Sequence, residues 1–371
     1  MKENLYIFYG GESVEHDISI ITALQVMRVM PELVPVYIGR NGVMHMAENL
    51  KDVKIYSDFD RLARGVKDVT FVSGKPYLAV KKGRKYGKFL PVNFALLCTH
   101  GRFGEDGALQ GILESCHIPY SSSNHISSAL CMDKIFMKDV LSSRGVPTVK
   151  GYPLVYEDYL SNKERVLKEV VKEIKFPLIL KPARLGSSIG IVVCKTKSDL
   201  VEGIEFCAKF DNRILVERFV EDAGEYNTAC VYMNGEVLIS DPVKVANKSQ
   251  IFTFEEKYLE NNAKNDEKIE KNLKKQLKTL AIQVYKIFNC FGVVRVDFIY
   301  DRKNQKLLVN ELNSIPGSLA FYLFKDLSFK DLLNCLIEEG KERSARERFV
   351  TAYDSEALDV FEKLNMDMTK K

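Results

Sequence analysis

The sequence has little of what marks a nucleic-acid-binding or membrane protein. Its 54 basic and 50 acidic residues give a net charge of +4, which is too even a balance to indicate nucleic acid or an anionic membrane as the main partner. No uncharged apolar run approaches the ~20 residues that span a bilayer. Of the 371 residues 46% are hydrophobic and 28% are charged, which is typical of a globular protein.

The eight cysteines form neither a metal-finger pattern nor a Cys-x-x-Cys motif. Several lie in apolar stretches, as Cys194 does, which favours buried free thiols in a reducing compartment over a disulfide framework. The N-terminal apolar run is short and ends at Gly10, so we interpret it as a first strand and not as a signal peptide. These features predict a cytoplasmic protein.

The length predicts two or three packed lobes of roughly 100–150 residues each. Over residues 1–122, short apolar strands alternate with helices, which predicts a parallel α/β lobe with an irregular hairpin between 60 and 90. The elements expected in this lobe are strands at 5–9, 34–38 and 94–98 and helices at 17–30 and 108–115.

Residues 123–216 and 217–371 are expected to form a central and a C-terminal lobe, so the fold class is α/β with three lobes. The elements expected there are helices at 126–144, 163–175 and 268–289, strands at 178–181, 214–217, 227–232 and 237–240, a polar loop at 247–266, a hairpin of 293–300 with 306–313, and a terminal helix or frayed tail within 340–371.

The hairpin carries the strongest local chemistry. Residues two apart on a strand share a face, so Arg295 and Asp297 point one way, and Glu311 and Asn313 do the same on the second strand. If Asp297 pairs opposite Glu311, all four side chains project together. Two carboxylates and an amide oxygen suit Mg²⁺, and the arginine suits developing negative charge. The alternative is a solvated face with exposed ion pairs, which four matched groups between apolar runs disfavour.

A second polar region follows the strand at 178–181. Lys181 at its end can reach phosphates, and the Gly- and Ser-rich loop up to Gly190 can close over them with its backbone N–H groups. The loop is not a Walker A motif, and taken alone it is more often a flexible turn. Lys134 is a second candidate phosphate contact, although a lone helical lysine is usually solvated. Residues 215–220 and Glu225 suit an adenosine slot or, equally, plain interdomain packing.

Nine motifs occur in order through nearly the whole chain. They are Gly10-Gly-Glu-Ser-Val-Glu15-His-Asp-Ile-Ser19, His100-Gly-Arg-Phe-Gly-Glu-Asp-Gly-Ala-Leu-Gln-Gly111, Ile118-Pro-Tyr, Met132-Asp-Lys134, Gly145-Val-Pro-Thr148, Lys181-Pro-Ala-Arg-Leu-Gly-Ser-Ser-Ile-Gly190, Phe254-Glu-Glu-Lys-Tyr258, Arg295-Val-Asp-Phe298 and Asn310-Glu-Leu-Asn-Ser-Ile-Pro-Gly317. With them the chain resembles the D-alanine–D-alanine ligase family of the ATP-grasp superfamily. Each motif alone is weak, but their succession is specific.

The resemblance implies an ATP-grasp fold with ATP held between the central and C-terminal lobes, a D-alanyl phosphate intermediate, and a homodimer formed through the N-terminal lobe. It implies that the ATP-binding residues are Lys134, Lys181, Ser188, Glu217, Phe219, Val220, Glu225 and Lys257. It implies that Asp297, Glu311 and Asn313 hold two Mg²⁺ or Mn²⁺ ions. It implies that Glu15, Ser187, Tyr258 and Arg295 are catalytic and that Ile18, His100, Ser318 and Tyr322 contact the substrates.

One position departs from the family pattern. After the Pro-Gly of the last motif the family usually continues Phe-Thr-x-x-Ser, and the later serine helps to hold the second substrate; here Tyr322 stands at that place. The sequence therefore predicts a D-alanine–D-alanine ligase for peptidoglycan synthesis or the same ligase with D-serine, D-lactate or another amine as second substrate. A non-catalytic ATP-binding protein is disfavoured, because Glu15, Arg295 and the metal-binding set are all present.

Overall fold

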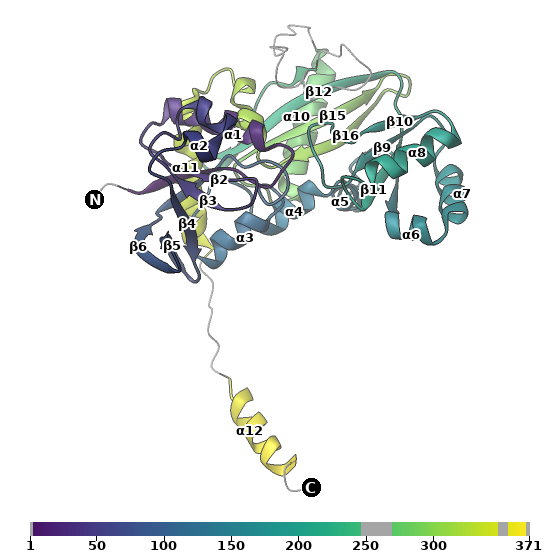
Figure 1. The fold of residues 1–371 in the computed structure, drawn as a ribbon. Coiled ribbons are helices and arrows are strands. Elements are labelled where there is room, and N and C mark those ends of the chain that lie inside the picture. The colour runs from purple at the N-terminus through teal and green to yellow at the C-terminus, as the bar shows by residue number, and fades with distance from the viewer. Residues whose placement is uncertain (1–2, 246–268, 348–354, 369–371) are drawn as a thin grey trace.

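A computed structural model of the chain describes residues 3–245, 269–347 and 355–368. Figure 1 shows three β-sheets, each with its own helices, and the terminal helix α12 drawn apart from them. The predicted α/β class with three sheet-based lobes agrees with this architecture. Within the described residues no helix is long and apolar enough to cross a membrane. The polar loop expected at 247–266 lies outside the described residues.

The N-terminal sheet has seven strands in the order β6-β5-β4-β3-β2-β1-β7. Its elements are β1 Leu5–Gly10, α1 His16–Val29, β2 Val34–Ile38, β3 Met44–Met46, η1 Val53–Ser57, α2 Phe59–Leu62, β4 Lys67–Val72, β5 Lys75–Lys82, β6 Lys85–Pro91, β7 Phe94–Leu97 and α3 Ala108–Ser115. The prediction of a parallel lobe was wrong for most of this sheet. Only β2, β1 and β7 run parallel, and β3 to β6 extend the sheet by antiparallel pairing.

The segment predicted as an irregular hairpin at 60–90 contains the three strands β4, β5 and β6. Their alternation is obscured in the sequence by register shifts after Phe71 and Ala79, where the pairing is irregular. The buried positions of β5 are Leu78, Ala79 and Val80, whereas β6 is mostly exposed because it forms the sheet edge.

The central sheet is antiparallel, with the strand order β10-β9-β11-β8. Its elements are α4 His125–Met132, α5 Lys134–Ser143, β8 Gly151–Val155, α6 Tyr156–Ser161, α7 Lys163–Glu173, β9 Leu178–Pro182, β10 Val192–Cys194, α8 Lys197–Cys207 and β11 Arg213–Arg218. The single helix predicted at 126–144 was wrong. Asp133 is extended there, and its carboxylate accepts from the N–H groups of Ile135 and Phe136, so it ends α4 and caps α5.

The C-terminal sheet is also antiparallel, in the order β13-β12-β15-β16 with β14 on β12. Its elements are β12 Ala223–Met233, β13 Glu236–Ile239, β14 Val243–Lys244, α10 Lys271–Ile287, β15 Val293–Asp301, β16 Lys306–Asn313, η2 Gly317–Leu323, α11 Phe329–Arg346 and α12 Ala357–Met368. The hairpin predicted at 293–313 is confirmed. The core of α10 is a row of buried residues from Leu273 to Tyr285.

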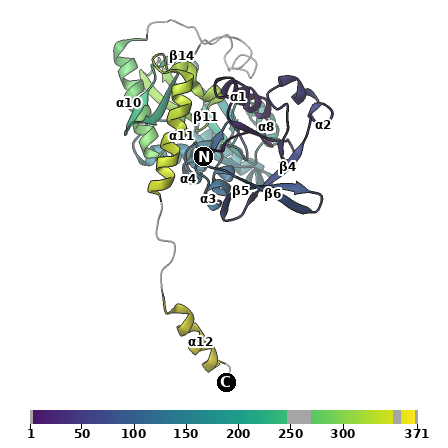
Figure 2. The same cartoon turned by 90° about the vertical axis from the view of Figure 1, so that its left-hand side faces the viewer.

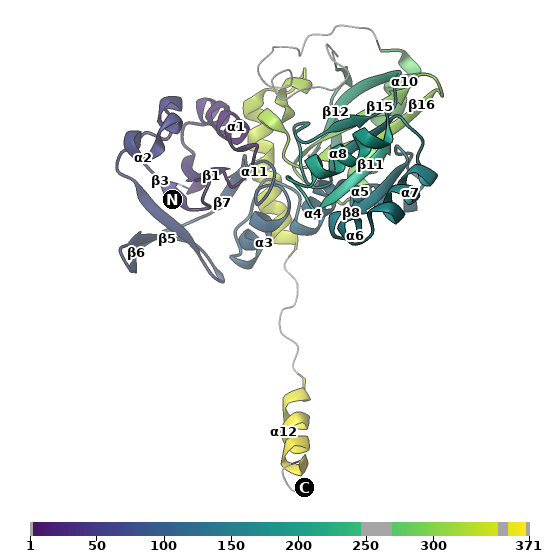
Figure 3. The same cartoon turned by 45° about the vertical axis from the view of Figure 1, so that its right-hand side comes forward.

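Helix α11 joins the N-terminal sheet to the C-terminal one, and Figure 3 shows it between them. Its residues Leu332 and Leu336 belong to the same buried cluster as Phe8 and Leu96 of the N-terminal sheet. Figure 2, turned by 90°, shows the same helix with α12 below it. The core of the N-terminal sheet is therefore completed by residues more than 200 positions later in the chain.

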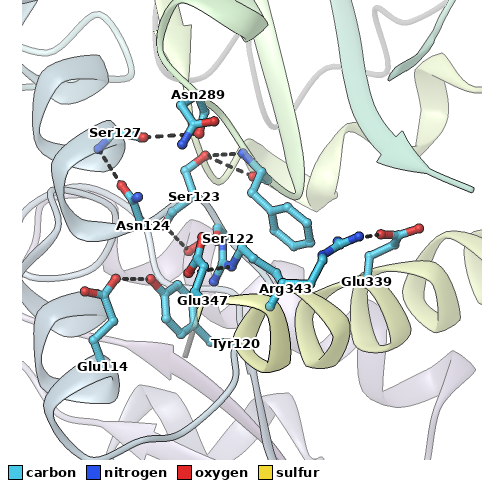
Figure 4. Close-up of polar contacts among 12 residues, drawn as sticks. Glu114, Tyr120, Ser122, Ser123, Asn124, Ser127, Asn289, Glu339, Arg343 and Glu347 are labelled. Carbon is cyan, nitrogen blue, oxygen red and sulfur yellow. Dashed lines mark hydrogen bonds and ion pairs between the residues drawn. The ribbon is translucent and has the colours of Figure 1, made fainter. Parts of the chain in front are cut away.

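The buried guanidinium of Arg343 anchors this junction (Figure 4). It donates to the carbonyl of Ser122 at 2.6 Å and lies over the rings of Tyr120 and Phe291, at 4.5 and 4.3 Å from their centroids. Ser123 adds a hydroxyl that donates to the Phe291 carbonyl and accepts from its N–H, both at 2.9 Å. Three segments distant in sequence are thus tied together around one cation.

Candidate active site

The two acidic strands pair as the metal-site prediction requires. On β15 and β16, Asp297 lies opposite Glu311 and Arg295 lies opposite Asn313. This register is reached through a β-bulge: beyond Asp297 the next pair is Phe298 with Val309, which leaves Asn310 as an extra residue. All four side chains therefore share one face of the sheet.

Asp297 is held by side chains from three neighbouring strands. The guanidinium of Arg295 forks onto its two oxygens at 2.7 and 2.8 Å, and the Asn313 amide donates to Oδ2 at 3.2 Å. Asn227 on β12 lies opposite Asp297, and its amide N donates to Oδ1 at 3.2 Å when the amide is oriented to satisfy both of its groups. Asn227 could not be predicted from local patterns, because the pairing of β12 with β15 is visible only in the fold.

The donor set fits a divalent cation that arrives with other oxygen ligands. Asp297 and Glu311 offer two carboxylates, and Asn313 offers an amide oxygen beside them. Nowhere among the described residues, this face included, do three His, Cys, Asp or Glu side chains gather as ligands. Mg²⁺ needs six oxygens in all, so phosphate groups and water must supply the remainder. The arrangement suits a metal–phosphate complex more than a bare ion.

Three lysines lie next to this face, two of them on one side of α5. Lys134 and Lys138 are one helical turn apart, and Lys181 is the next-to-last residue of β9. The Nζ of Lys134 lies 3.5 Å from Oε2 of Glu311 and donates to the Leu185 carbonyl at 2.6 Å. Lys138 was missed by the sequence prediction, although its i, i+4 spacing from Lys134 was the available signal.

The carboxylate of Glu217 lies between two of these lysines. Its oxygens are 2.6 Å from Nζ of Lys138 and 2.7 Å from Nζ of Lys181. Burial lowers the pKa of Lys138. At Lys181 burial also acts to lower the pKa, but the pairing with Glu217 and other acidic neighbours outweighs it, so the pKa is raised. Burial also favours a neutral Glu217, but the two ammonium charges outweigh burial, so its pKa is lowered. The Glu217 side chain thus faces the lysines in a fully buried ion cluster.

The bulge residue Asn310 extends this cluster, because its Oδ1 accepts from Nζ of Lys181 at 2.9 Å. Asn310 was part of a quoted motif but was given no role. The contact joins the central sheet to the C-terminal sheet at the point where lysines and acidic groups meet.

Three loops meet at a second carboxylate, that of Glu15. The hydroxyl of Ser187 donates to its Oε1. A Cβ at Gly186 would lie 2.9 Å from both Glu15 oxygens, and a Cβ at Gly101 would lie 2.2 Å from the Ser13 hydroxyl. Neither glycine can therefore carry a side chain without displacing the carboxylate or its turn. The structure brings the first, second and sixth quoted motifs together at Glu15.

The loop that carries Ser187 has an unusual backbone. Ser187 and Ser188 have φ values of 55° and 57°, in the left-handed region that L-residues rarely adopt. Lys134 fastens the loop through the carbonyl of Leu185, so the serine loop and the lysine helix share one anchor.

Glu105 is a further acid that the sequence prediction missed, although it lies in a quoted motif. Burial and then the charge of Glu15 raise its pKa well above the ordinary value, and the N–H groups of Gly101 and Ile315 oppose the rise. Two neighbouring carboxyl groups repel each other when both are ionised. The raised pKa therefore favours a protonated, neutral Glu105 beside Glu15.

A further side of the site consists of α1, which begins directly after Glu15, and η2. Ile18 is buried on α1, and Tyr322 on η2 is 45% exposed. Ser318, Leu319 and Ala320 all have φ between 48° and 52°, a conformation that costs roughly 1–2 kcal/mol per residue. The turn therefore depends on contacts from its surroundings.

His100 is buried beside η2, with both ring nitrogens used inside the protein. Its Nδ1 lies 2.7 Å from the Ile315 carbonyl and its Nε2 lies 3.1 Å from the hydroxyl of Thr22. Burial, with a smaller effect of Arg295, lowers the pKa of His100 to about 4. At this predicted substrate contact the structure therefore shows a neutral ring that connects Ile315 to Thr22.

Two family models cover most of the chain. The model of the D-ala D-ala ligase N-terminus matches residues 4–123, and that of the D-ala D-ala ligase C-terminus matches residues 140–338. The chain belongs to the D-alanine–D-alanine ligase family. Its three sheets accordingly have the ATP-grasp fold, and the chain is an ADP-forming ligase that uses ATP.

Individual relatives of this ligase agree over nearly their full length. The D-alanine–D-alanine ligase of Thermosipho melanesiensis is 36% identical over 361 residues, 94% of this chain and 96% of the relative. That of Caldicellulosiruptor bescii is 31% identical over 365 residues, 94% and 98% of the two chains. Among solved structures, the ligase from Coxiella burnetii is similar with a TM-score of 0.77 and 27% identity, over 93% of this chain and 96% of that one.

Three further predicted residues of the ligase, Phe219, Val220 and Glu225, lie where the central and C-terminal sheets meet. The N–H of Phe219 donates to the Pro177 carbonyl at 3.0 Å, and Val220 is buried against Val149 and Leu308. Glu225 is half-buried on β12. Lys257 and Tyr258 lie outside the described residues, so their predicted places beside the ATP and Glu15 stay predictions.

Proposed function

We propose that this enzyme joins two molecules of D-alanine at the expense of ATP. The carboxylate of the first D-alanine attacks the γ-phosphorus, and ADP leaves. The amine of the second then attacks the acyl carbon, loses a proton and displaces phosphate. The observation that supports this function most directly is the placement of Glu15 and the Ser187 loop against Lys134, which itself reaches Glu311 of the acidic hairpin.

The lysine cluster is suited to the triphosphate. We assign phosphate contacts to Lys134 and Lys181, with the N–H groups of the Ser187–Ser188 loop beside them. Glu217 pairs with both Lys138 and Lys181 and holds their side chains in place before ATP binds. A preformed cationic cradle needs little reorganisation when the phosphate charge arrives.

The acidic hairpin would hold the metal. Asp297, Glu311 and Asn313 would bind two Mg²⁺ or Mn²⁺ ions together with phosphate oxygens. Bound there, the metal would neutralise phosphate charge and orient the γ-phosphoryl group for in-line attack. The fork from Arg295 aligns Asp297 and leaves the guanidinium on the same face, where it can stabilise charge developing on the acyl carbon's oxygen.

The first D-alanine is assigned to the Glu15 side. Its ammonium group would lie against Glu15, where Glu105 adds a second carboxyl and Ser187 orients the first. Adenosine would lie between the two ATP-grasp sheets, held by Phe219, Val220, Glu225 and the strand that carries Glu217. Lys257 and Tyr258 would belong to a loop that closes over the site and keeps water from the acyl phosphate.

The second D-alanine is assigned to the side formed by Ile18, Ser318 and Tyr322. Tyr322 is exposed where the family usually has a serine, but the relatives are D-alanine–D-alanine ligases over their whole length, which favours D-alanine over D-serine, D-lactate or another amine.

The test is phosphate release by the purified enzyme with ATP, Mg²⁺ and a panel of D- and L-amino acids and D-lactate, followed by mass measurement of the products. We expect D-alanyl-D-alanine as the main product. A panel in which no D-amino acid stimulates phosphate release contradicts the proposal. A mixed product such as D-alanyl-D-serine retains the mechanism but replaces the second substrate.

Two further assignments accompany the proposed function. The eight free cysteines are all buried, which supports action in the reducing cytoplasm. Homodimerisation through the N-terminal lobe follows from the family alone, and light scattering that gives a monomer mass at working concentrations would refute it.

A further inference from the structure

Thr22 connects the two substrate sides of the site. It is fully buried on α1, the helix that begins next to Glu15 and carries Ile18. Its hydroxyl oxygen accepts from the N–H of Ser318 at 3.0 Å and lies 3.1 Å from Nε2 of His100. None of the residues in the quoted motifs makes this link, because Thr22 lies three positions after the first motif ends.

The direction of each hydrogen bond is fixed by its partners. The Ile315 carbonyl can only accept, so Nδ1 of His100 carries a proton and donates to it at 2.7 Å. In the neutral ring Nε2 is then an acceptor, and the Thr22 hydroxyl donates to it. The hydroxyl oxygen keeps its lone pairs for the N–H of Ser318. Burial lowers the pKa of His100 to about 4, which keeps the ring neutral at physiological pH.

The turn held by Thr22 has a backbone conformation that its own residues disfavour. Ser318, Leu319 and Ala320 follow one another in the left-handed region, and none is a glycine. Such a conformation persists where surrounding contacts over-determine it. Inside the turn the Leu319 N–H donates to the Pro316 carbonyl at 2.8 Å, and from outside Thr22 fixes the N–H of the preceding residue.

We propose that Thr22 is a positioning residue that holds the Ser318–Ala320 turn so that the second substrate meets the first in register. The inference rests on the proposed function, which assigns Ser318 and Tyr322 to the second substrate. Because α1 also presents Ile18 and adjoins Glu15, one hydroxyl sets the spacing between the two substrate sides. The Thr22 hydroxyl itself touches neither substrate.

Two variants at this position separate hydrogen bonding from shape. Thr22→Val keeps the volume but removes both hydrogen bonds, and Thr22→Ser keeps both and removes a methyl group. With the best second substrate of the wild type, we expect Thr22→Val to raise the KM for the second substrate by about tenfold or more, with the KM for the first D-alanine and for ATP changed by less than about threefold. Thr22→Ser should restore the second KM to within about twofold of wild type.

Thr196→Val is the matched control, because Thr196 caps α8 away from η2 and its loss lowers stability without touching the turn. It should leave all three KM values near wild type. If Thr22→Val does not fold, Thr22→Ala is measured in its place. An unchanged second KM in a folded valine or alanine variant overturns the inference, as does an equal rise in all three KM values or a serine variant as impaired as the valine one. If wild type makes no D-alanyl product at all, the proposed function fails first and the inference falls with it.

Discussion

The Nζ of Lys138 lies 2.6 Å from Oε1 of Glu217, in a place where both side chains are closed off from solvent. The other Glu217 oxygen holds Lys181 at 2.7 Å. A single carboxylate thus fixes two ammonium groups on the side where the triphosphate is expected. Such a cluster is costly to bury and is stable only while its partners remain complete.

Glu217→Gln should therefore destabilise the folded protein strongly. The variant removes the carboxylate that pairs with two buried lysines, and we expect a loss of about 3–5 kcal/mol in the free energy of unfolding. Urea unfolding followed by circular dichroism measures it. Glu173→Gln is the control, because its ion pair with Lys150 is solvent-exposed and should matter by less than about 1 kcal/mol. Equal losses in the two variants would show that the buried cluster contributes nothing special.

Asp297→Ala and Glu311→Ala should each abolish ATP turnover in a folded protein. Each removes one of the two carboxylates on the shared face, and the remaining ligands are too few to fix a metal–phosphate complex. Steady-state phosphate release with excess Mg²⁺ is the measurement. The metal should also bind weakly to wild type until ATP is added, as titration calorimetry can show. Near-normal turnover in both variants would remove the metal assignment.

Arg295→Ala should reduce kcat much more than it weakens ATP binding. The guanidinium aligns Asp297 and faces the reacting groups, so its loss acts on the transition state, by about 100-fold or more. Nucleotide affinity measured by fluorescence should change by less than about tenfold. A kcat like that of wild type rules out the transition-state role.

Acid should destabilise the protein through His100. Its pKa is lowered to about 4 from the ordinary 6.5, so between these values the unfolded chain binds a proton that the folded one does not. Stability contributed by the neutral ring is complete above pH 6.5, falls as the pH drops toward 4, and declines no further below it. The total is about 3 kcal/mol. His100→Asn should show a shallower decline over this interval in urea unfolding at stepped pH, and parallel curves for the two proteins would contradict the assignment.

Arg343→Met should loosen the junction between α11 and the two loops that it holds. Methionine keeps much of the volume but leaves the Ser122 carbonyl without its donor and removes the cation from the Tyr120 and Phe291 rings. We expect a loss of about 2–4 kcal/mol in thermal or urea unfolding. Arg346→Met, at a position 57% exposed on the same helix, should cost less than about 1 kcal/mol. A loss no greater than that of the control refutes the anchoring role.

Local patterns predicted the acidic hairpin well. Alternation of polar and apolar residues placed Arg295 with Asp297 and Glu311 with Asn313, and the turn between the strands set their pairing to within one residue. The bulge at Asn310 is a departure from regular pairing that alternation alone does not locate. The helix break at Asp133 was also missed, because apolar periodicity continues through it while the capping carboxylate ends the helix.

Long-range relations were out of reach of the sequence. Lys138 carries a helical spacing signal, but only the fold shows that Glu217 lies against it. Asn227 and Thr22 take their partners from strands and turns far along the chain, at Asp297 and Ser318. The antiparallel extension of the N-terminal sheet was obscured by irregular register in β4 and β5. In each case the physical cause is tertiary pairing, which no local pattern encodes.

The bulge at Asn310 also determines how the second strand of the hairpin tolerates changes in length. Leaving Asn310 out of the count, Leu307, Val309 and Leu312 fall on the packed side and Leu308, Glu311 and Asn313 on the other, in unbroken alternation. Deletion of Asn310 would therefore preserve the alternation between the packed side and the side that carries the acidic groups. It would remove the amide that accepts from Lys181. Deletion of one residue between 307 and 309 would instead reverse the alternation, so that on one side of the deletion the packed residues and the acidic residues exchange faces.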